Sequence, residues 1–425
     1  MCSFHANNND TDTLSSPATV NNPPSYSSHD QLHKEVLDPP FLKTIDSTID
    51  SLTDDLRKLS IFIWEHPELG FKEVQAHNEL TSFMKKSGFN VTPHHLGLET
   101  AWRAEFSHGE NGRVIGLQSE MDALPGLGHA CGHNLIAITG VAVAVALKAA
   151  LVEHDIPGKI ILLGTPAEEF GGGKIELLNK GAYDEMDVCL MAHPGPGALN
   201  GTVVQPWIAI QNLEVEFTGH PAHAAYAPWE GQNALDAAFL AYSAISALRQ
   251  QIKPTERVHG VLAGKDWETN VIPDYAKMKW AIRATSWEGL VALRTRVNAC
   301  FEGAAHATSC KVDIKEGVVY KDCRQNDVLA REYLRIAQNN YGMGAVSTDT
   351  SLQASTDLVS SLIPTIQPVF HVPTVKGGSN HTEAFKDSAG TQEAHDAAIK
   401  TSKVLACTAL RVLTDNGVWE DVRSL

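Results

Sequence analysis

Basic side chains are scarce in this sequence. It contains 34 lysine and arginine residues against 50 aspartate and glutamate residues, which gives a formal net charge of −16 and an isoelectric point near 5.6. A surface that binds nucleic acid needs clustered lysine and arginine to neutralise phosphates. We therefore expect no nucleic-acid partner, and we interpret the acidity as a source of solubility.

Long apolar runs are also missing. No stretch reaches the roughly 18 uncharged apolar residues that a membrane-spanning helix needs. The nearest candidate, residues 135–151, is rich in alanine and valine and is typical of a buried helix. The N-terminal segment has neither the basic start nor the apolar stretch of a secretory signal peptide. These features predict that the protein has no membrane partner.

The cysteines do not form a disulfide framework. There are seven, an odd number, and their spacing is irregular. In a large chain without a secretion signal, such cysteines are expected to be reduced and mostly buried. We therefore predict a cytoplasmic location. Cys131 is an exception, because its neighbours point to a chemical role.

Large apolar side chains are almost absent from residues 1–40, where Asn, Ser, Thr, Pro and His dominate. Such a segment cannot bury enough apolar surface to offset the entropy lost on ordering. We predict a disordered tail over residues 1–40.

The rest of the chain is too long for one compact core, so two domains are expected. Apolar residues at three- and four-residue steps in 45–63 indicate an amphipathic helix that ends near His66 and Pro67. Beyond it, the pattern predicts strands at 114–117, 159–164 and 187–191, and helices at 135–154 and 172–180. This order predicts an α/β fold with a parallel or mixed sheet covered by helices.

The pattern changes after about Trp207. We predict strands at 208–217, 275–284 and 312–316, and helices at 233–251 and 287–307. This order is typical of a compact α+β unit inserted into a larger domain. The predicted architecture is a sheet-based domain in two sequence pieces, residues 41–206 and 320–425, interrupted by a smaller α+β domain, residues 207–319.

Residues that bind metals or move protons follow the predicted strands. In chain order they are Asp122, Cys131 and His133 after the first strand, Glu168 and Glu169 after the second, His193 after the third, and His381 in a loop near the C-terminus. Each alone has a simpler explanation, such as a helix cap for a histidine or a solvated face for adjacent glutamates. Ligands gather at the carboxyl edge of parallel strands, however, so these groups are expected to converge. A mixture of thiolate, imidazole and carboxylate is what a pair of borderline-soft divalent metals selects, whereas Mg²⁺ prefers oxygen.

Glu168 and Glu169 are expected to have separate roles. Neighbours on an extended segment point to opposite sides, so one can hold a metal while the other faces the attacking water. A carboxylate in that position can take the proton of the water and later deliver it to a leaving amine. Divalent metals lower the pKa of such a water to about 7. The residues therefore predict metal-dependent hydrolysis.

The same residues carry a resemblance to the M20 peptidase family, in its amidohydrolase/aminoacylase branch and closest to its dipeptidases. The matching stretches cover nearly everything beyond the tail: residues 64–70, 122–134, 164–169, 192–194, 221–224, 228–231, 270–273 and 381–383. The resemblance implies hydrolysis of an amide bond in a dipeptide or N-acyl amino acid, with two divalent metal ions, Zn or Mn. It implies Cys131, His133, Glu169, His193 and His381 as metal ligands. It also implies Glu168 as general base and Asp122 as a carboxylate that orients the centre.

The resemblance further implies that the sheet-based domain is the di-metal catalytic domain. It implies that the inserted α+β domain closes over the substrate as a lid and forms a homodimer. His223 would reach the active site of the partner protomer and stabilise the oxyanion, with Asn270 assisting. Arg283 would hold a substrate carboxylate, for which a bidentate guanidinium is well suited. Structural alternatives remain for all three: a helix cap for His223, a turn before Pro273 for Asn270, and a strand-face ion pair for Arg283.

Two segments depart from the family pattern. A Gly-Asn pair is missing after Ser355-Thr356-Asp357, and Thr365-Ile366-Gln367-Pro368 replaces a Gly-Ile-His-Pro pattern. Both are expected to shape the substrate pocket. They leave open an ATP-independent amide-forming or acyl-transfer enzyme that uses the same site. A non-catalytic binding protein on the same scaffold is a further alternative, which the intact ligand set disfavours.

Overall fold

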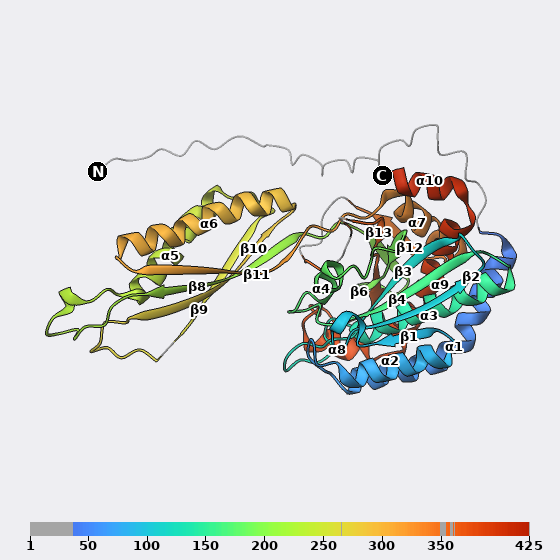
Figure 1. Ribbon diagram of the computed structural model, residues 1–425, viewed down its shortest axis with the longest axis horizontal. Helices are drawn as coiled ribbons and strands as arrows, with labels where there is room; N and C mark the ends of the chain where they lie inside the picture. Colours follow the sequence, from blue (N-terminus) through green and yellow to red (C-terminus); the bar gives the residue numbers. More distant parts are fainter. Residues whose placement is uncertain (1–36, 265, 349–353, 358–359, 361, 425) are drawn as a thin grey trace, which may run out of the picture. The chain divides into compact units, whose positions relative to one another are not determined.

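The computed structural model describes residues 37–264, 266–348, 354–357, 360 and 362–424 (Figure 1). The predicted tail, residues 1–40, therefore falls outside the described residues except for its last four. Of these, Pro39 and Pro40 form the first turn of helix α1 (Pro39–Glu65). Proline is tolerated there because the first N–H groups of a helix have no partner within the helix. The last two residues of the predicted tail therefore belong to this helix.

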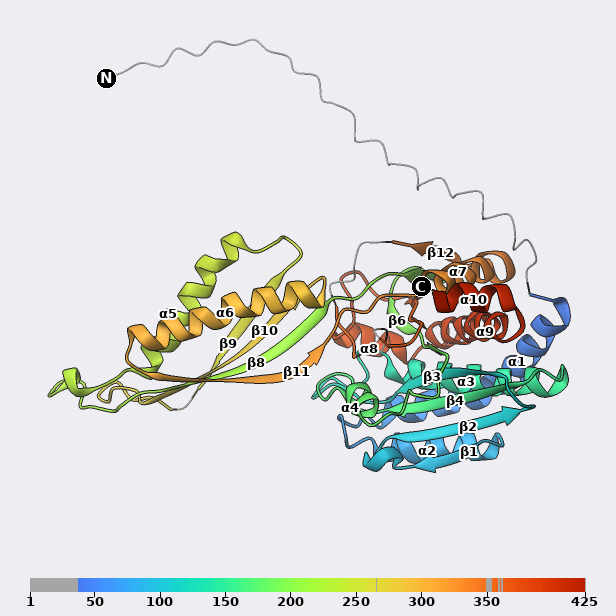
Figure 2. The ribbon, with the colours of Figure 1, turned by 45° about the horizontal axis from the view of Figure 1, so that its top comes forward.

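The first sheet is mixed and has six strands. Their order is β1 (Asn90–Pro93), β2 (Trp102–His108), β4 (Gly158–Thr165), β3 (Arg113–Glu120), β5 (Val188–Leu190) and β13 (Thr365–Ile366). β3 is parallel to both β4 and β5, whereas β2 is antiparallel to β4. The central strands β3 and β4 are buried along most of their length, as their apolar runs predict. Figures 1 and 2 show the helices packed around this sheet.

Helix α3 (His133–Glu153) lies at the centre of this part of the molecule. It packs against α1, β3 and α9 (Gln392–Thr414). It is the one described helix that is long and apolar enough to cross a membrane, but 78% of that stretch is buried inside the protein. The observed surroundings are those of a core helix. The other helices here are α2 (Val74–Lys86), α4 (Gly173–Asn179), α7 (Asp327–Tyr341), α8 (Glu383–Ala389) and α10 (Asn416–Ser424).

A second sheet in the same part of the molecule was not expected from the sequence. Its order is β12 (Gly344–Ser347), β7 (Gly201–Val204), β14 (Val369–Val372) and β6 (His193–Pro196). Each strand has only four residues, and β6 reads His-Pro-Gly-Pro, which has no alternating apolar pattern. The strands form because β14 pairs with both β6 and β7, and that contact is distant in sequence.

The third sheet is antiparallel, with the order β11 (Lys311–Tyr320), β8 (Ala209–Thr218), β10 (Tyr275–Ala284) and β9 (Arg257–Ala263). Helices α5 (Ala234–Leu248) and α6 (Trp287–Ala307) pack on it and on each other (Figure 2), around a hydrophobic cluster of their own. β9 was missed from the sequence, because half of it is exposed at the edge of the sheet. β11 ends at Tyr320, one residue beyond the predicted boundary of the inserted domain.

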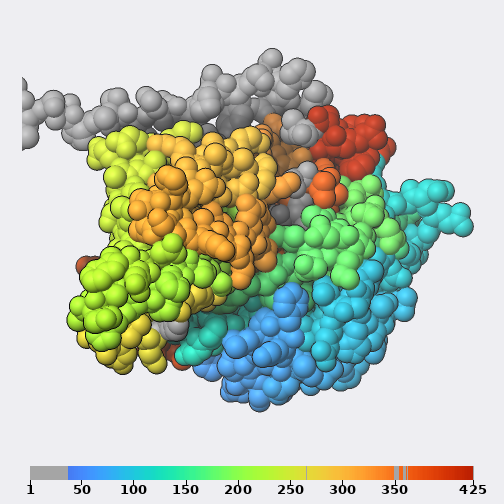
Figure 3. Space-filling model, turned by 60° about the vertical axis from the view of Figure 1, so that its left-hand side comes forward, coloured from blue at the N-terminus to red at the C-terminus, as the bar shows by residue number. Residues whose placement is uncertain are grey.

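Single-turn 3-10 helices complete the described secondary structure: His95–Gly97, Pro228–Glu230 and Arg249–Gln251. In Figure 3 the third sheet and its helices form the yellow-green to orange surface. The six cysteines among the described residues are all free, and four of them are buried, in agreement with the prediction that they are reduced.

Candidate metal centre

The N-terminus of α3 carries Cys131 and His133 on either side of Gly132. Gly132 adopts a left-handed conformation with φ +80°, and a Cβ at this position would lie 2.6 Å from Cγ of Pro194. Only glycine combines this backbone conformation with so close an approach. The loop is thereby pressed against the first residues of β6, where His193 lies.

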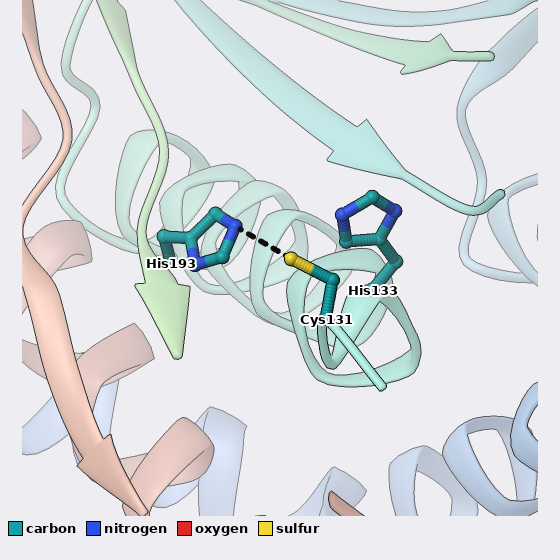
Figure 4. Close-up of side chains that lie close together, drawn as sticks. All are labelled: Cys131, His133 and His193. Carbon is teal, nitrogen blue, oxygen red and sulfur yellow. Dashed lines mark hydrogen bonds between the residues drawn. The ribbon is translucent and has the colours of Figure 1, made fainter. Parts of the chain in front are cut away.

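Five predicted ligands form two groups that share Cys131. One group is Cys131, His133 and His193, and the other is Cys131, Glu169 and His381. Within each group the ligand atoms lie within 4.8 Å of one another. Sγ of Cys131 is 3.5 Å from Nε2 of His193 (Figure 4), and Nε2 of His381 is 3.3 Å from Oε2 of Glu169. Because the two groups share Cys131, these residues would hold two divalent cations next to each other.

The loop of His381 is tied to the same place. The backbone N–H of His381 donates to the carbonyl of Ala130 at 2.9 Å, and the side chain of Asn380 donates to the carbonyl of Pro194 at 3.1 Å. His381 has a positive φ of 68°, which is uncommon for a residue with a side chain. Such strain persists only where the surrounding contacts enforce it, and it is frequent at functional sites.

The chemistry of these residues fits a pair of divalent cations. Nε2 of His133 and Oε1 of Glu169 are buried and have no hydrogen-bond partner among the described residues. Nδ1 of His193 faces the carbonyl of Pro194 at 2.8 Å, which places the proton on Nδ1 and leaves Nε2 free to bind a metal. Burial lowers the pKa of His193 to about 4, so the ring is neutral. Burial raises the pKa of the Cys131 thiol, so its thiolate needs a nearby cation.

Asp122 connects the two groups. One carboxylate oxygen lies 3.1 Å from Nδ1 of His133, and the other accepts the backbone N–H of Glu169 at 3.0 Å. Burial would raise the pKa of Asp122, but the charge of His133 and these hydrogen bonds lower it below its usual value. The carboxylate is therefore held in its charged form, which fits the predicted orienting role.

Glu168 and Glu169 lie in a turn, which corrects the expectation of an extended segment. Ala167 has a positive φ of 57°, so the chain turns directly after β4. Both carboxylates therefore face the same place: Oε2 of Glu168 and Oε1 of Glu169 each lie 3.8 Å from Nε2 of His133. Burial, with the nearby charge of Glu120, raises the pKa of Glu168 well above its usual value. A raised pKa suits a carboxylate that exchanges a proton near neutrality.

A buried ion network beside the centre was missed from the sequence. Nζ of Lys174 lies 2.6 Å from Oε1 of Glu120 and forms a close ion pair with Asp357, and all three side chains are fully buried. Burial would lower the pKa of Lys174, but the two carboxylates raise it well above its usual value. The other oxygen of Glu120 lies 3.4 Å from Nε2 of His133. The available signal was Glu120 itself, because a charged residue ends the buried strand β3.

Glu120 also belongs to a third group of possible ligands, together with His133 and Glu168. Because Lys174 already occupies one oxygen of Glu120, we interpret Glu120 as a neighbour of the cation positions. It places a negative charge next to His133 that Lys174 partly neutralises.

The three residues predicted to bind substrate are not joined to the centre by any hydrogen bond or ion pair of the described residues. His223 is exposed, and its Nδ1 accepts the N–H groups of Ala225 and Tyr226, which is a capping arrangement. The carbonyl of Asn270 accepts the N–H of Ala224 at 3.0 Å. Arg283, on β10, donates to Oγ of Ser355 at 3.1 Å. The oxyanion role of His223 and Asn270 and the carboxylate-binding role of Arg283 therefore stay predictions.

Comparison with known proteins adds independent information. Residues 210–308 match the family model described as a peptidase dimerisation domain. The chain is 42% identical to the Xaa-Arg dipeptidase of Mus musculus over 392 residues, covering 88% of this chain and 89% of that protein. It is 40% identical to the Xaa-Arg dipeptidase of Homo sapiens over 396 residues, with the same coverage.

The fold also has close counterparts among solved structures. A Bacillus subtilis protein, described as a dinuclear metal-binding peptidase from the M20 family, superposes with a TM-score of 0.67 at 21% identity. The superposition covers 86% of this chain and 99% of that one. At this level of identity the similarity concerns the fold, which confirms the predicted α/β architecture with its inserted α+β unit.

Proposed function

The chain belongs to the M20 peptidase family, and we propose that it hydrolyses dipeptides with a basic C-terminal residue at a pair of divalent cations. Hydrolysis of an amide bond follows from its relatives, which are named dipeptidases and share about nine tenths of their length with it. One observation carries the proposed mechanism. The two groups that meet at Cys131 bring all five predicted ligands together, and Glu168 lies beside them.

The proposed ligands are Cys131, His133 and His193 for one cation, and Cys131, Glu169 and His381 for the other. We propose Zn or Mn, because nitrogen, sulfur and oxygen ligands together suit borderline divalent metals. Bound cations of this kind make water acidic enough to react near neutral pH and polarise the scissile carbonyl.

Glu168 carries the proton through the reaction. Its carboxylate accepts a proton from the attacking water, whose oxygen forms a bond to the carbonyl carbon. The same proton is then delivered to the nitrogen of the leaving amine as the carbon–nitrogen bond breaks. Burial, with the nearby charge of Glu120, raises the pKa of Glu168 well above its usual value, which makes its carboxylate a stronger base toward the proton of the water.

The substrate class is proposed from the two relatives that are named Xaa-Arg dipeptidases. In the proposed complex, Arg283 holds the C-terminal carboxylate of the dipeptide. His223 and Asn270 contribute to the oxyanion site, with His223 supplied by the partner protomer. We also retain the cytoplasmic location as a proposal.

The proposed dimer uses the surface of the third sheet. Phe239, Leu240 and Tyr242 on α5 are 57%, 42% and 41% exposed, and Val261 on the edge strand β9 is 50% exposed. Neighbouring exposed apolar side chains of this kind mark interaction surfaces, and an unpaired strand edge can pair with a second copy. This surface lies within the segment that matches the dimerisation domain.

The function is tested with purified protein loaded with Zn²⁺ or Mn²⁺. We expect release of arginine or lysine from dipeptides that end in these residues, at a kcat/KM at least about tenfold above dipeptides that end in leucine or glutamate. Glu168→Gln should retain both metals and lose activity by about a thousandfold, because a general base contributes on that order. Glu153→Gln, at an exposed site at the end of α3, is the matched control.

Two results would contradict the proposal. Full turnover by Glu168→Gln would remove Glu168 from its role. Metal-loaded protein that forms amides from free amino acids more readily than it hydrolyses them would favour the amide-forming alternative.

A further inference from the structure

The turn that carries Glu168 is held by side chains at three consecutive residues. The N–H of Ala167 donates to Oε1 of Glu73 at 2.9 Å, and the N–H of Glu169 donates to Asp122. Between them, the carbonyl of Glu168 accepts the phenolic hydroxyl of Tyr320 at 2.8 Å. Asp122 is part of the metal centre, whereas Tyr320 is the last residue of β11 and comes from the third sheet.

Tyr320 is also packed against the loop that follows Glu168. A Cβ added to Gly172 would lie 3.4 Å from Cε1 of Tyr320 and 2.7 Å from Cγ1 of Val318. The end of β11 therefore contacts this loop through a ring, an aliphatic side chain and a hydrogen bond. Burial, together with the nearby charges of Asp357 and Glu168, raises the pKa of Tyr320, so its hydroxyl remains a donor at any physiological pH.

The turn needs such support because its backbone is strained. Ala167 occupies the left-handed region, which costs roughly 1 kcal/mol or more for a residue with a Cβ. A Cβ on Gly70 would lie 2.8 Å from Cβ of Ala167, so the turn has little room to shift toward this segment. Rotation of the peptide between Glu168 and Glu169 would move the Glu168 carboxylate. Two hydrogen bonds oppose this rotation: Asp122 accepts the N–H of Glu169, and Tyr320 donates to the carbonyl of Glu168.

We propose that Tyr320 is a positioning residue that fixes the Glu168 carboxylate for proton transfer. The inference rests on the proposed function, in which Glu168 carries the proton. Proton transfer requires a donor–acceptor distance near hydrogen-bond length. A carboxylate displaced by about an ångström therefore transfers the proton much more slowly. Because Tyr320 ends a strand of the third sheet, a displacement of β11 is transmitted to Glu168 through this contact.

The test compares Tyr320→Phe with Tyr333→Phe in metal-loaded protein. Each change removes one hydrogen-bonded hydroxyl. That of Tyr320 is partly buried, and that of Tyr333 lies 3.0 Å from Oγ1 of Thr202, within the core. We expect Tyr320→Phe to lower kcat about tenfold at unchanged KM and unchanged metal stoichiometry. Tyr333→Phe should change the melting temperature by a similar amount and leave kcat as it is.

A double variant separates positioning from a general structural effect. If Tyr320 acts through Glu168, then adding Tyr320→Phe to Glu168→Gln should cause no further loss, because the group being positioned is already gone. An equal tenfold loss in that background would overturn the proposal. So would wild-type kcat in the single variant, or loss of metal from it.

The proposal and the proposed function can fail separately. Turnover retained by Glu168→Gln would refute the function assigned to that residue, whatever Tyr320 does. An inactive Glu168→Gln together with a fully active Tyr320→Phe would leave the function intact and refute only the role of Tyr320.

Discussion

At the scale of single residues, burial shifts the pKa of several carboxyl groups away from their usual values. Glu73 is the clearest example outside the metal ligands. Its Oε1 accepts the N–H groups of Phe71 and Ala167, and its Oε2 lies 2.6 Å from the hydroxyl of Thr100. Burial raises its pKa to about 7. When Glu73 takes a proton, Oε1 still accepts both N–H groups and the new hydroxyl can donate to Thr100, so the turn is held in both states.

This raised pKa predicts a pH dependence of stability. The folded state binds more protons than the unfolded state between the usual pKa of 4.5 and about 7, so the free energy of unfolding falls as pH rises through this range. The shift corresponds to about 3 kcal/mol. Glu73→Gln cannot titrate, so the difference between the wild type and this variant should change between pH 4.5 and 7 and stay constant above it. Urea unfolding of the two metal-free proteins at a series of pH values measures this difference in the free energy of unfolding.

Glu73→Ala provides the contrast. It leaves the N–H groups of Phe71 and Ala167 without their acceptor, so we expect a loss of about 2 kcal/mol at every pH. Parallel stability curves for the wild type and Glu73→Gln would show that Glu73 does not titrate in this range.

At the scale of elements, helix α3 places Cys131 and His133 by packing tightly on the sheet. Gly140 lies at its contact with β3, where an added Cβ would be 2.6 Å from the carbonyl oxygen of Gln118 and 3.0 Å from Leu162. Both neighbours belong to the sheet, and the nearer atom is backbone, which cannot move aside cheaply. The close approach of α3 to the sheet therefore depends on this glycine.

Two alanine substitutions in helices test this packing. Gly140→Ala should lower the free energy of unfolding by about 1–3 kcal/mol and weaken metal binding, because α3 must move away from the sheet. Gly303→Ala, in α6, should raise the free energy of unfolding by about 0.5–1 kcal/mol. A Cβ at this position meets nothing within 4 Å, and alanine favours the helix. Chemical denaturation and metal titration provide the measurements. A stabilised Gly140→Ala would contradict the packing argument.

At the scale of the whole molecule, the proposed dimer makes catalysis depend on association. His223 is exposed and caps its own loop within one chain, and its proposed oxyanion role is in the active site of the partner protomer. The exposed apolar residues of α5 are the proposed contact. Helix α5 lies within residues 210–308, which match the family model described as a peptidase dimerisation domain.

A charge placed on this surface tests the dimer. Phe239→Asp should shift the protein from dimer to monomer in light scattering at micromolar concentration, because a carboxylate would be buried without a partner. Turnover should fall with the dimer fraction and recover at high protein concentration. Val152→Asp is the control, since Val152 is 53% exposed on α3, outside the matched segment. Full activity of monomeric Phe239→Asp would show that no group from the partner is needed.

Much of the architecture follows from local pattern. Uninterrupted apolar runs predict β3 and β4, because strands that are buried on both faces are apolar throughout. Apolar residues at three- and four-residue spacing predict α1, because they form the one buried face of a helix. The ligand types at the ends of the strands likewise predict a metal centre. Parallel strands bring their carboxyl ends to one edge wherever the rest of the chain lies.

The sequence by itself determined which chemical groups the centre contains, because thiolate, imidazole and carboxylate are properties of single residues. Only the tertiary structure decided how they are held. The short strands of the second sheet, the ion pairs of Lys174 with Glu120 and Asp357, and the bond from Tyr320 to Glu168 all join residues far apart in the chain. Such contacts leave no periodic trace in the sequence, since each exists only when the distant segments have already packed together.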